Sequence, residues 1–304
     1  MSGVITTGNH PKALWPGVKA WFGAAYGNHA TEYTDLFAVE TSDKNYEEDV
    51  QLTGFGMAPV KTQGAGVAYT SHSQGWEKRY VHVVYGLGYI VTREEMEDNL
   101  YEKVSRSRAE ALAFSMRQTK ENVHANVVNR AFNTSYLGGD GKALCVSDHP
   151  TKAAGNVSNV LSVAADLSEA SIEDMIIQIM GATDDMGMQI NLMPKGLFVA
   201  RQNWFEANRI LKSVLQADTA NNALNVLKAT NALPGGIKVN HYFSDADAWF
   251  VTTNAPRGLI SYKRRGLEFT KDNDFDTENA KAKATERYSC GWTDWRCIFG
   301  SAGA

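Results

Sequence analysis

The most regular hydrophobic pattern in the chain runs from residue 93 to residue 132. Thr92 and Glu95 form a capping box ahead of it, and acidic residues crowd the first turns, where the helix dipole favours negative charge. Apolar residues then recur at the spacing of one helix face: Met96, Leu100, Val104, Leu112, Met116, Val123 and Val127. At about 1.5 Å per residue, the pattern predicts one continuous helix roughly 60 Å long, a spine that is unusual in a compact enzyme.

The segment from residue 51 to residue 91 changes from glycine-rich to strand-like. Its glycines disfavour regular structure and mark bends: Gly54, Gly56, Gly64, Gly66 and Gly75. The stretch from Lys78 to Thr92 is rich in β-branched and aromatic residues, which is typical of a long strand. We therefore predict an extended two-stranded loop over 51–91 that projects from a body, with its tip near 61–73.

Residues 1–50 scatter aromatic side chains among glycines and polar residues: Trp15, Trp21, Phe22, Tyr26, Tyr33 and Phe37. Helical spacing is weak here, so these aromatic side chains need another surface to pack on. That surface belongs either to a neighbouring subunit or to the chain's own domain, and the sequence does not separate the two alternatives.

Short helices and strands alternate after the predicted spine. Ser168 and Ser171 cap a helix that ends near Gly181, and strand-like and helical segments then follow each other through residues 190–253. This middle third is typical of a small α/β or α+β unit. The final segment, from Arg264 onward, predicts two β-rich arms around a charged turn. We expect an α+β fold.

Composition and charge exclude several classes of protein. Thirty basic and thirty-four acidic residues leave a formal net charge of −4, whereas a protein that grips nucleic-acid phosphates needs a clustered basic surplus. The longest apolar stretch, residues 81–91, is too short and too polar to cross a bilayer. The N-terminus lacks the layout of a signal peptide, and three cysteines, an odd count, argue against a disulfide framework. We expect a soluble protein that folds in a cytosol and binds no membrane.

Metal-ligand and nucleotide-binding patterns give no positive signal. The chain lacks the phosphate-binding G-x-x-x-x-G-K-[ST], the dinucleotide G-x-G-x-x-G, the hydrolase G-x-S-x-G and the zinc motif H-E-x-x-H. Asp272, Asp274 and Asp276 have the spacing of a calcium loop. Thr277 replaces the glycine of that loop and Lys283 its bidentate glutamate, which excludes an EF-hand and favours a solvated acidic turn.

The cysteines do not form a recognisable reactive site either. Cys145 lies close in sequence to Asp148 and His149, but a free cysteine is more often a small buried hydrophobe than a nucleophile. Cys290 and Cys297 are one widely spaced pair, whereas a zinc site needs two close pairs. The basic run 263–265 is typical of a solvated face. We predict no catalytic residue, no cofactor and no metal.

Residues 249–301 combine an apolar strand, an N-A-P turn, a basic strand, an acidic D-N-D-F-D-T turn and a closing strand with G-W-T-D-W-R. In this order they resemble the Mu-like major head proteins of tailed bacteriophages. Residues 168–213 are similar to the preceding region of the same family. The order of loop, spine, middle unit and returning strands also matches, so the resemblance covers the chain from about Gly54 onward.

The resemblance implies a Hong Kong ninety-seven-type capsid fold. Its parts would be an N-terminal arm over 1–50, an extended E-loop hairpin over 51–91, a peripheral domain over 92–150 with the spine helix at 93–132, an axial domain over 151–255, and return strands of the peripheral domain over 256–304. The implied function is that of a major capsid protein without enzymatic activity. Pentamers and hexamers of such a chain build an icosahedral shell in the host cytoplasm, and in the virion the shell encloses double-stranded DNA without sequence-specific binding.

The same resemblance suggests partners and contact residues. Residues 1–50 do not resemble a long charged coiled coil, so scaffolding is expected from a separate protein, beside a portal protein and with room for a decoration protein. Contacts between subunits are expected at six residues: Lys61, Gln63, Trp76, Arg79, Trp292 and Trp295. Trp292 and Trp295 are three residues apart, so one strand face does not hold both, and we predict one in the core and the other at a subunit contact.

Two alternatives from other classes stay open at this point. An encapsulin-like shell has the same fold but loads protein cargo. A hydrolase would use Cys145 and His149, or a metal held at 272–276.

Overall fold

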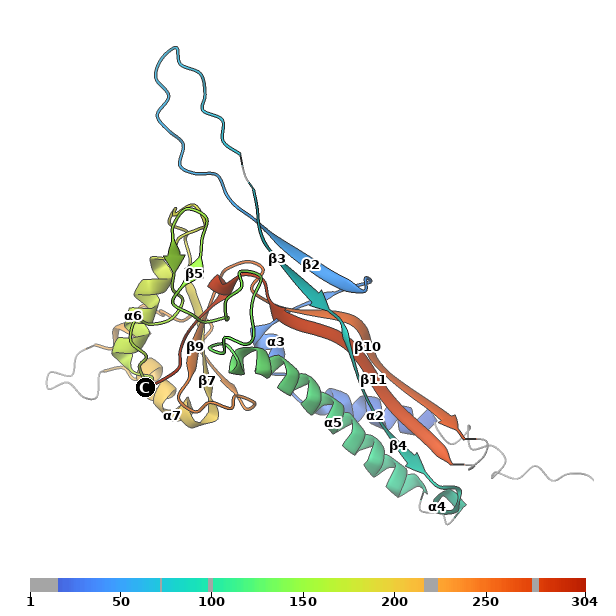
Figure 1. Cartoon of the computed structure of the whole chain (residues 1–304). Helices are drawn as coiled ribbons and strands as arrows, with labels where there is room; N and C mark the ends of the chain where they lie inside the picture. The colour runs from blue at the N-terminus through green and yellow to red at the C-terminus, as the bar shows by residue number, and fades with distance from the viewer. Residues whose placement is uncertain (1–15, 72, 98–100, 216–223, 275–278) are drawn as a thin grey trace, which may run out of the picture.

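The computed structural model describes residues 16–71, 73–97, 101–215, 224–274 and 279–304. The body contains two four-stranded sheets, and a two-stranded ribbon projects from it (Figure 1). The first sheet has the strand order β1-β10-β11-β4 and the second the order β12-β9-β7-β8. The predicted α+β class is confirmed.

The first sheet is long and narrow. β10 (Leu259–Asn273) and β11 (Ala280–Trp292) run antiparallel, β4 (Val83–Val91) pairs with the other side of β11, and the short β1 (Ala38–Thr41) lies parallel to β10. Buried and exposed residues alternate along the first half of β11. The alanines of this alternation pack in one cluster with residues of the helix α5, and their small side chains let the helix approach closely.

The spine is two helices, α4 (Arg93–Glu97) and α5 (Tyr101–Asn129), and not one helix from 93 to 132. Arg108 donates to both carboxylate oxygens of Glu95, at 3.0 and 2.7 Å, although the two residues are 13 positions apart. In one straight helix that separation is about 20 Å along the axis, beyond the reach of the two side chains. α4 therefore turns back toward α5. At the other end, α5 stops at Asn129 and residues 130–132 form turns.

The described part of the N-terminal segment packs on its own chain. Of the two surfaces left open by the sequence, it therefore uses the chain's own domain. Residues 1–15 lie outside the described residues. α2 (Pro16–Asn28) lies along α5, and Phe22 is buried in the cluster beneath it. Arg117 of α5 donates to the Tyr26 carbonyl at 3.0 Å. Glu121 accepts from the backbone N–H of Tyr33 at 2.9 Å, where α3 (Tyr33–Leu36) begins.

The second sheet forms the other lobe. Its strands are β7 (Pro194–Ala200), β8 (Ile237–Asn240), β9 (Trp249–Thr253) and β12 (Ile298–Ser301). The described residues of this lobe form three helices: α6 (Glu169–Met180), α7 (Trp204–Lys212), which follows the short η2 (Arg201–Asn203), and α8 (Val226–Ala229). The predicted capping box of Ser168 and Ser171 at the start of α6 is confirmed.

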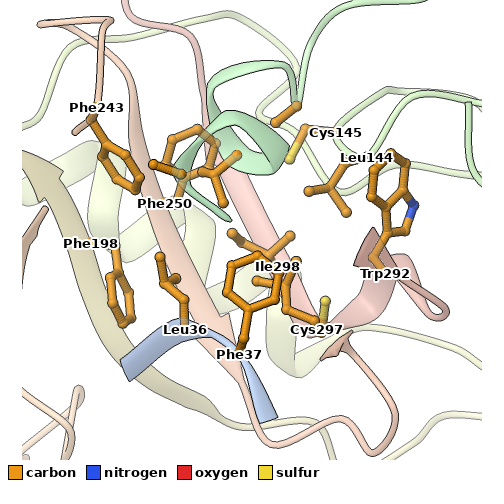
Figure 2. Packing of buried hydrophobic residues seen from close by; sticks show 14 of the residues in the cluster. Leu36, Phe37, Leu144, Cys145, Phe198, Phe243, Phe250, Trp292, Cys297 and Ile298 are labelled. Carbon is orange, nitrogen blue, oxygen red and sulfur yellow. The ribbon is translucent and has the colours of Figure 1, made fainter. Parts of the chain in front are cut away.

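The end of the chain crosses from one sheet to the other. Residues 256–304 were all expected to return to the peripheral domain, but β12 pairs with β9, so residues 298–301 complete the second sheet instead. η3 (Trp295–Cys297) makes the crossing, beside the small hairpin of β5 (His149–Pro150) and β6 (Asn156–Val157). A core between the sheets joins both lobes to the N-terminal segment (Figure 2): it includes Leu36, Phe37, Leu144, Cys145, Phe198, Phe243, Phe250, Trp292, Cys297 and Ile298.

A buried histidine predicts how the stability of this fold changes with pH. His124 on α5 has its Nδ1 2.7 Å from the Lys120 carbonyl and its Nε2 2.8 Å from the Ser261 hydroxyl. Burial lowers the pKa of His124 to about 4. As the pH is lowered, the imidazole of His124 takes up a proton near pH 6.5 in the unfolded chain but only near pH 4 in the folded chain. The free energy of unfolding therefore decreases as the pH falls from about 6.5 to about 4.

The expected loss from this residue between pH 7 and pH 5 is about 2 kcal/mol, measured by urea unfolding at both values. His124→Gln removes the titrating group and is expected to reduce the pH dependence by that amount. Equal pH dependence in His124→Gln and the unchanged protein would show that His124 does not contribute.

Candidate assembly surface

The projecting ribbon is built from β2 (Tyr46–Leu52) and β3 (Gln74–Val81), and the described residues of 53–73 belong to the loop between them (Figure 1). The hairpin was predicted over 51–91, whereas in the structure it spans 46–81 and so begins and ends earlier in the chain. The predicted strand 78–92 is interrupted at His82, whose ring is buried between the hydroxyls of Ser42 and Ser289. Beyond His82 the chain leaves the ribbon as β4 and joins the long sheet.

The loop carries large apolar side chains that its own chain leaves exposed: Phe55, Met57, Val60, Val67 and Tyr69. Val60 is 93% and Tyr69 96% exposed. Full burial of one such side chain stabilises a contact by about 1.5–3 kcal/mol, and an exposed apolar group of this kind marks an interaction surface. We refer to residues 53–73 as the apolar loop.

A buried carboxylate fixes the base of the ribbon to the long sheet. Asp49 on β2 accepts hydrogen bonds from the hydroxyls of Tyr262 at 3.1 Å and Thr293 at 2.8 Å. Arg257 Nη1 lies 3.3 Å from the other carboxylate oxygen. Burial, followed by the charge of Asp49, raises the pKa of the Tyr262 hydroxyl, which therefore stays protonated and can donate.

A second contact joins the ribbon to the other lobe. Gln51 donates from Nε2 to Asp185 at 2.7 Å, and the buried Arg296 pairs with the same carboxylate at 2.8 Å. The ribbon is thus held by both lobes, so a force on the apolar loop is transmitted to the whole subunit. Sequence analysis missed Asp49, Gln51 and Asp185, because their partners lie more than 100 positions away.

Replacing Asp49 by asparagine is expected to lower the free energy of unfolding by about 1–3 kcal/mol, because an amide cannot serve as the common charged acceptor of these donors. Hydrogen exchange is expected to speed up over residues 46–81 more than elsewhere. Asp43→Asn is the matched control, because the Asp43 side chain is fully exposed and its carboxylate is as far as 3.9 Å from the guanidinium of Arg264. Equal effects of the two substitutions would contradict this role of Asp49.

Four of the six predicted contact residues lie on the ribbon and its loop. Lys61 and Gln63 are exposed in the apolar loop, Trp76 is half-buried, and Arg79 is exposed and paired with Glu48 on the neighbouring strand. Their role between subunits stays a prediction.

The two tryptophans, by contrast, lie in the interior. Trp292 packs in the core between the sheets, and Trp295, at 2% exposure, packs in the core of the second sheet. The ring of Trp295 stacks on His149 at 4.3 Å between centroids. Both side chains are thus buried within the subunit, whereas one of them was expected at its surface, and a role of either between subunits stays a prediction.

The geometry also fails to support a cysteine nucleophile. Cys145 is buried, and burial raises the pKa of its thiol far above its usual range. The ring nitrogens of His149 lie against oxygens of Asp140 at 2.6 Å and Asn159 at 3.2 Å, so both nitrogens have hydrogen-bond partners other than Cys145.

Two ion pairs join charged residues in and beside the long sheet. Lys281 lies 2.5 Å from Asp274, and Arg265 lies 3.5 Å from Glu268. Asp276 of the predicted acidic turn lies outside the described residues. Within the described ranges, no three His, Cys, Asp or Glu side chains come together in a metal-binding arrangement. In the same ranges, no helix is both long and apolar enough to span a bilayer.

The subunit thus has two lobes and a projecting ribbon with an exposed apolar loop, and comparisons with known proteins give its class. The sequence profile of the phage capsid protein family matches residues 77–300. The chain belongs to that family. It is a structural subunit of a phage shell and a component of the virion, and it is not an enzyme. No curated protein sequence matches the chain.

Solved structures share the fold at low sequence identity. A Mycobacterium phage Patience chain is similar over 99% of this chain and 89% of its own, with 12% identity and a TM-score of 0.54. The procapsid of bacteriophage JBD30 is similar over 98% of this chain and 76% of its own, with 16% identity and a TM-score of 0.50. A virus-like particle from Pyrococcus furiosus is similar over 95% of this chain and 99% of its own, with 12% identity and a TM-score of 0.51. The expected Hong Kong ninety-seven-type fold is confirmed.

Proposed function

We propose that this chain is the major head subunit of an icosahedral shell that encloses double-stranded DNA. The observation that carries the proposal is a ribbon anchored to both lobes, whose loop leaves the side chains of Met57, Val60, Val67 and Tyr69 largely exposed on the subunit. Burying it on the next subunit supplies the favourable free energy of assembly, and many such contacts add up in a closed shell. The formal net charge of −4 suits a wall that holds DNA without binding it tightly.

The parts of the chain then have separate roles. The ribbon with the apolar loop is the E-loop that overlaps a neighbour, α4, α5 and the long sheet form the peripheral domain, and the second sheet with α6 and α7 forms the axial domain around five- and six-fold axes. The described part of the N-terminal arm braces the spine of its own subunit.

The subfamily, the place of assembly and the partner proteins are proposed from the sequence. The C-terminal motifs favour the Mu-like head proteins within the capsid family. Assembly takes place in the host cytoplasm with a separate scaffolding protein and a portal protein, and the finished shell has room for a decoration protein.

Nuclease protection tests what the shell encloses. Particles purified from a lysate of the infected host are treated with nuclease and then opened. Double-stranded DNA of genome length is the expected content. The similarity to the Pyrococcus furiosus particle, whose chain is matched over almost its whole length, makes an encapsulin-like container the second candidate. Particles with protein cargo and no protected DNA would establish that candidate instead.

A further inference from the structure

The long sheet has one protected edge and one open edge. On the β10 side, β1 pairs with residues 260–263, and two register shifts interrupt β10 between Lys263 and Glu268. β4 forms the opposite edge, and none of the described strands pairs with its outer side. Bulges, prolines and charged residues are the usual means by which a protein keeps an edge strand from pairing with another chain.

β4 has none of these protections. Its nine residues, VVYGLGYIV, include no charged residue and no proline, and it pairs with β11 without a register shift. Successive side chains of a strand point to opposite faces of the sheet, so apolar side chains flank the open edge on both faces. Four of them are between 49% and 57% exposed: Val83, Val84, Leu87 and Ile90. A long apolar edge of this kind pairs readily with a further strand.

The sequence of β4 is almost a palindrome about Leu87. Toward either end from Leu87, the chain reads glycine, tyrosine, a β-branched residue and valine. When two copies of this strand run antiparallel with Leu87 opposite Leu87, each residue faces its mirror-image position in the other copy. Residues of the same kind and size are then opposed: Gly86 with Gly88, Tyr85 with Tyr89, Val84 with Ile90 and Val83 with Val91. Aromatic and β-branched pairs across two strands stabilise a sheet.

We propose that β4 pairs antiparallel with β4 of a second copy of this chain, about a two-fold axis at Leu87, so that two long sheets become one continuous sheet. The occupant of the open edge is a second copy because the strand is complementary to itself in size and carries no charge. A two-fold contact joins two copies and does not by itself build a ring. In the shell it would join copies that belong to different rings, and in this respect the inference rests on the proposed function.

Two single cysteine variants test the pairing and its register. In the proposed pair, Val84 of one copy faces Ile90 of the other, at the Cα separation of about 5 Å that a disulfide needs. The two Val84 residues lie six positions apart along the strands, about 20 Å. A mixture of Val84→Cys and Ile90→Cys is therefore expected to give disulfide-linked dimers when oxidised with diamide. Each variant alone is expected to give no more dimer than the unchanged protein, which controls for the three native cysteines.

A charge at the axis tests the contact in a second way. Leu87→Lys in both cysteine variants places two ammonium groups opposite each other and is expected to lower the yield of linked dimer about tenfold. Val39→Lys is the matched control, because Val39 is 48% exposed on β1, at the other edge of the same sheet, and it is expected to leave the yield unchanged. Both lysine variants are expected to keep the melting temperature of the subunit, since neither residue is buried.

The outcomes separate this contact from the proposed function. No linked dimer from the mixture, equal linkage in the single variants, or equal yields with Leu87→Lys and Val39→Lys would overturn the pairing, even in a protein that forms shells. Linked dimers from a chain that forms no shells would support the pairing and contradict the proposed function.

Discussion

A subunit with Val60, Val67 and Tyr69 replaced by aspartate is expected to fold normally and to form no closed shells. These side chains are exposed in the apolar loop, so placing charge there leaves the interior of the subunit unchanged. The proposed function places the same positions on a neighbour in the assembled shell, where an unpaired carboxylate would cost several kcal/mol per contact. The measurements are thermal unfolding of the isolated subunit and sedimentation of the assembly reaction.

The matched control keeps the apolar surface. Val60→Ile, Val67→Ile and Tyr69→Phe in one chain are expected to assemble at close to the wild-type yield. If the aspartate variant sedimented as shells, the apolar loop would not be an assembly element. If it lost its cooperative unfolding transition, the loop would be part of the folded core, against the exposure that the structure shows.

Replacing either tryptophan of the C-terminal motif by alanine is expected to destabilise the isolated subunit by about 3–5 kcal/mol. Trp292 fills the core between the two sheets, with Lys78 Nζ 5.1 Å from the centre of its ring. Trp295 fills the core of the second sheet and stacks on His149. Both effects are expected in the monomer, measured by chemical unfolding before any assembly.

Phe205→Ala is the control for this pair of substitutions. Its side chain is largely exposed in the subunit, so the free energy of unfolding is expected to change by no more than about 0.5 kcal/mol. A tryptophan variant that kept full monomer stability but weakened particles would restore the predicted role of that residue at a subunit contact.

Local patterns predicted the local structure of this chain. The β-rich residues from Arg264 onward predicted two strand-like arms, which are parts of β10 and β11, and Ser168 with Ser171 predicted the start of α6. The glycine-rich loop and the long helical stripe indicated an arm and a spine before any comparison. Each of these features depends on residues a few positions apart.

The remaining features depend on contacts between distant residues. The position of α4 relative to α5 depends on the ion pair of Glu95 with Arg108, 13 positions away. The move of β12 into the second sheet depends on its pairing with β9. The burial of Trp295 depends on His149, and no spacing rule links residues so far apart. Contacts between residues distant in sequence therefore determine the features that the sequence analysis predicted incorrectly.

Electron microscopy of the purified full-length chain tests the central claim most directly. Vitrified or negatively stained samples, prepared at a concentration that favours assembly, are expected to show closed shells of uniform diameter with pentameric and hexameric rings. Only monomers, or amorphous aggregates of a protein that unfolds cooperatively as a monomer, would contradict a self-assembling shell subunit.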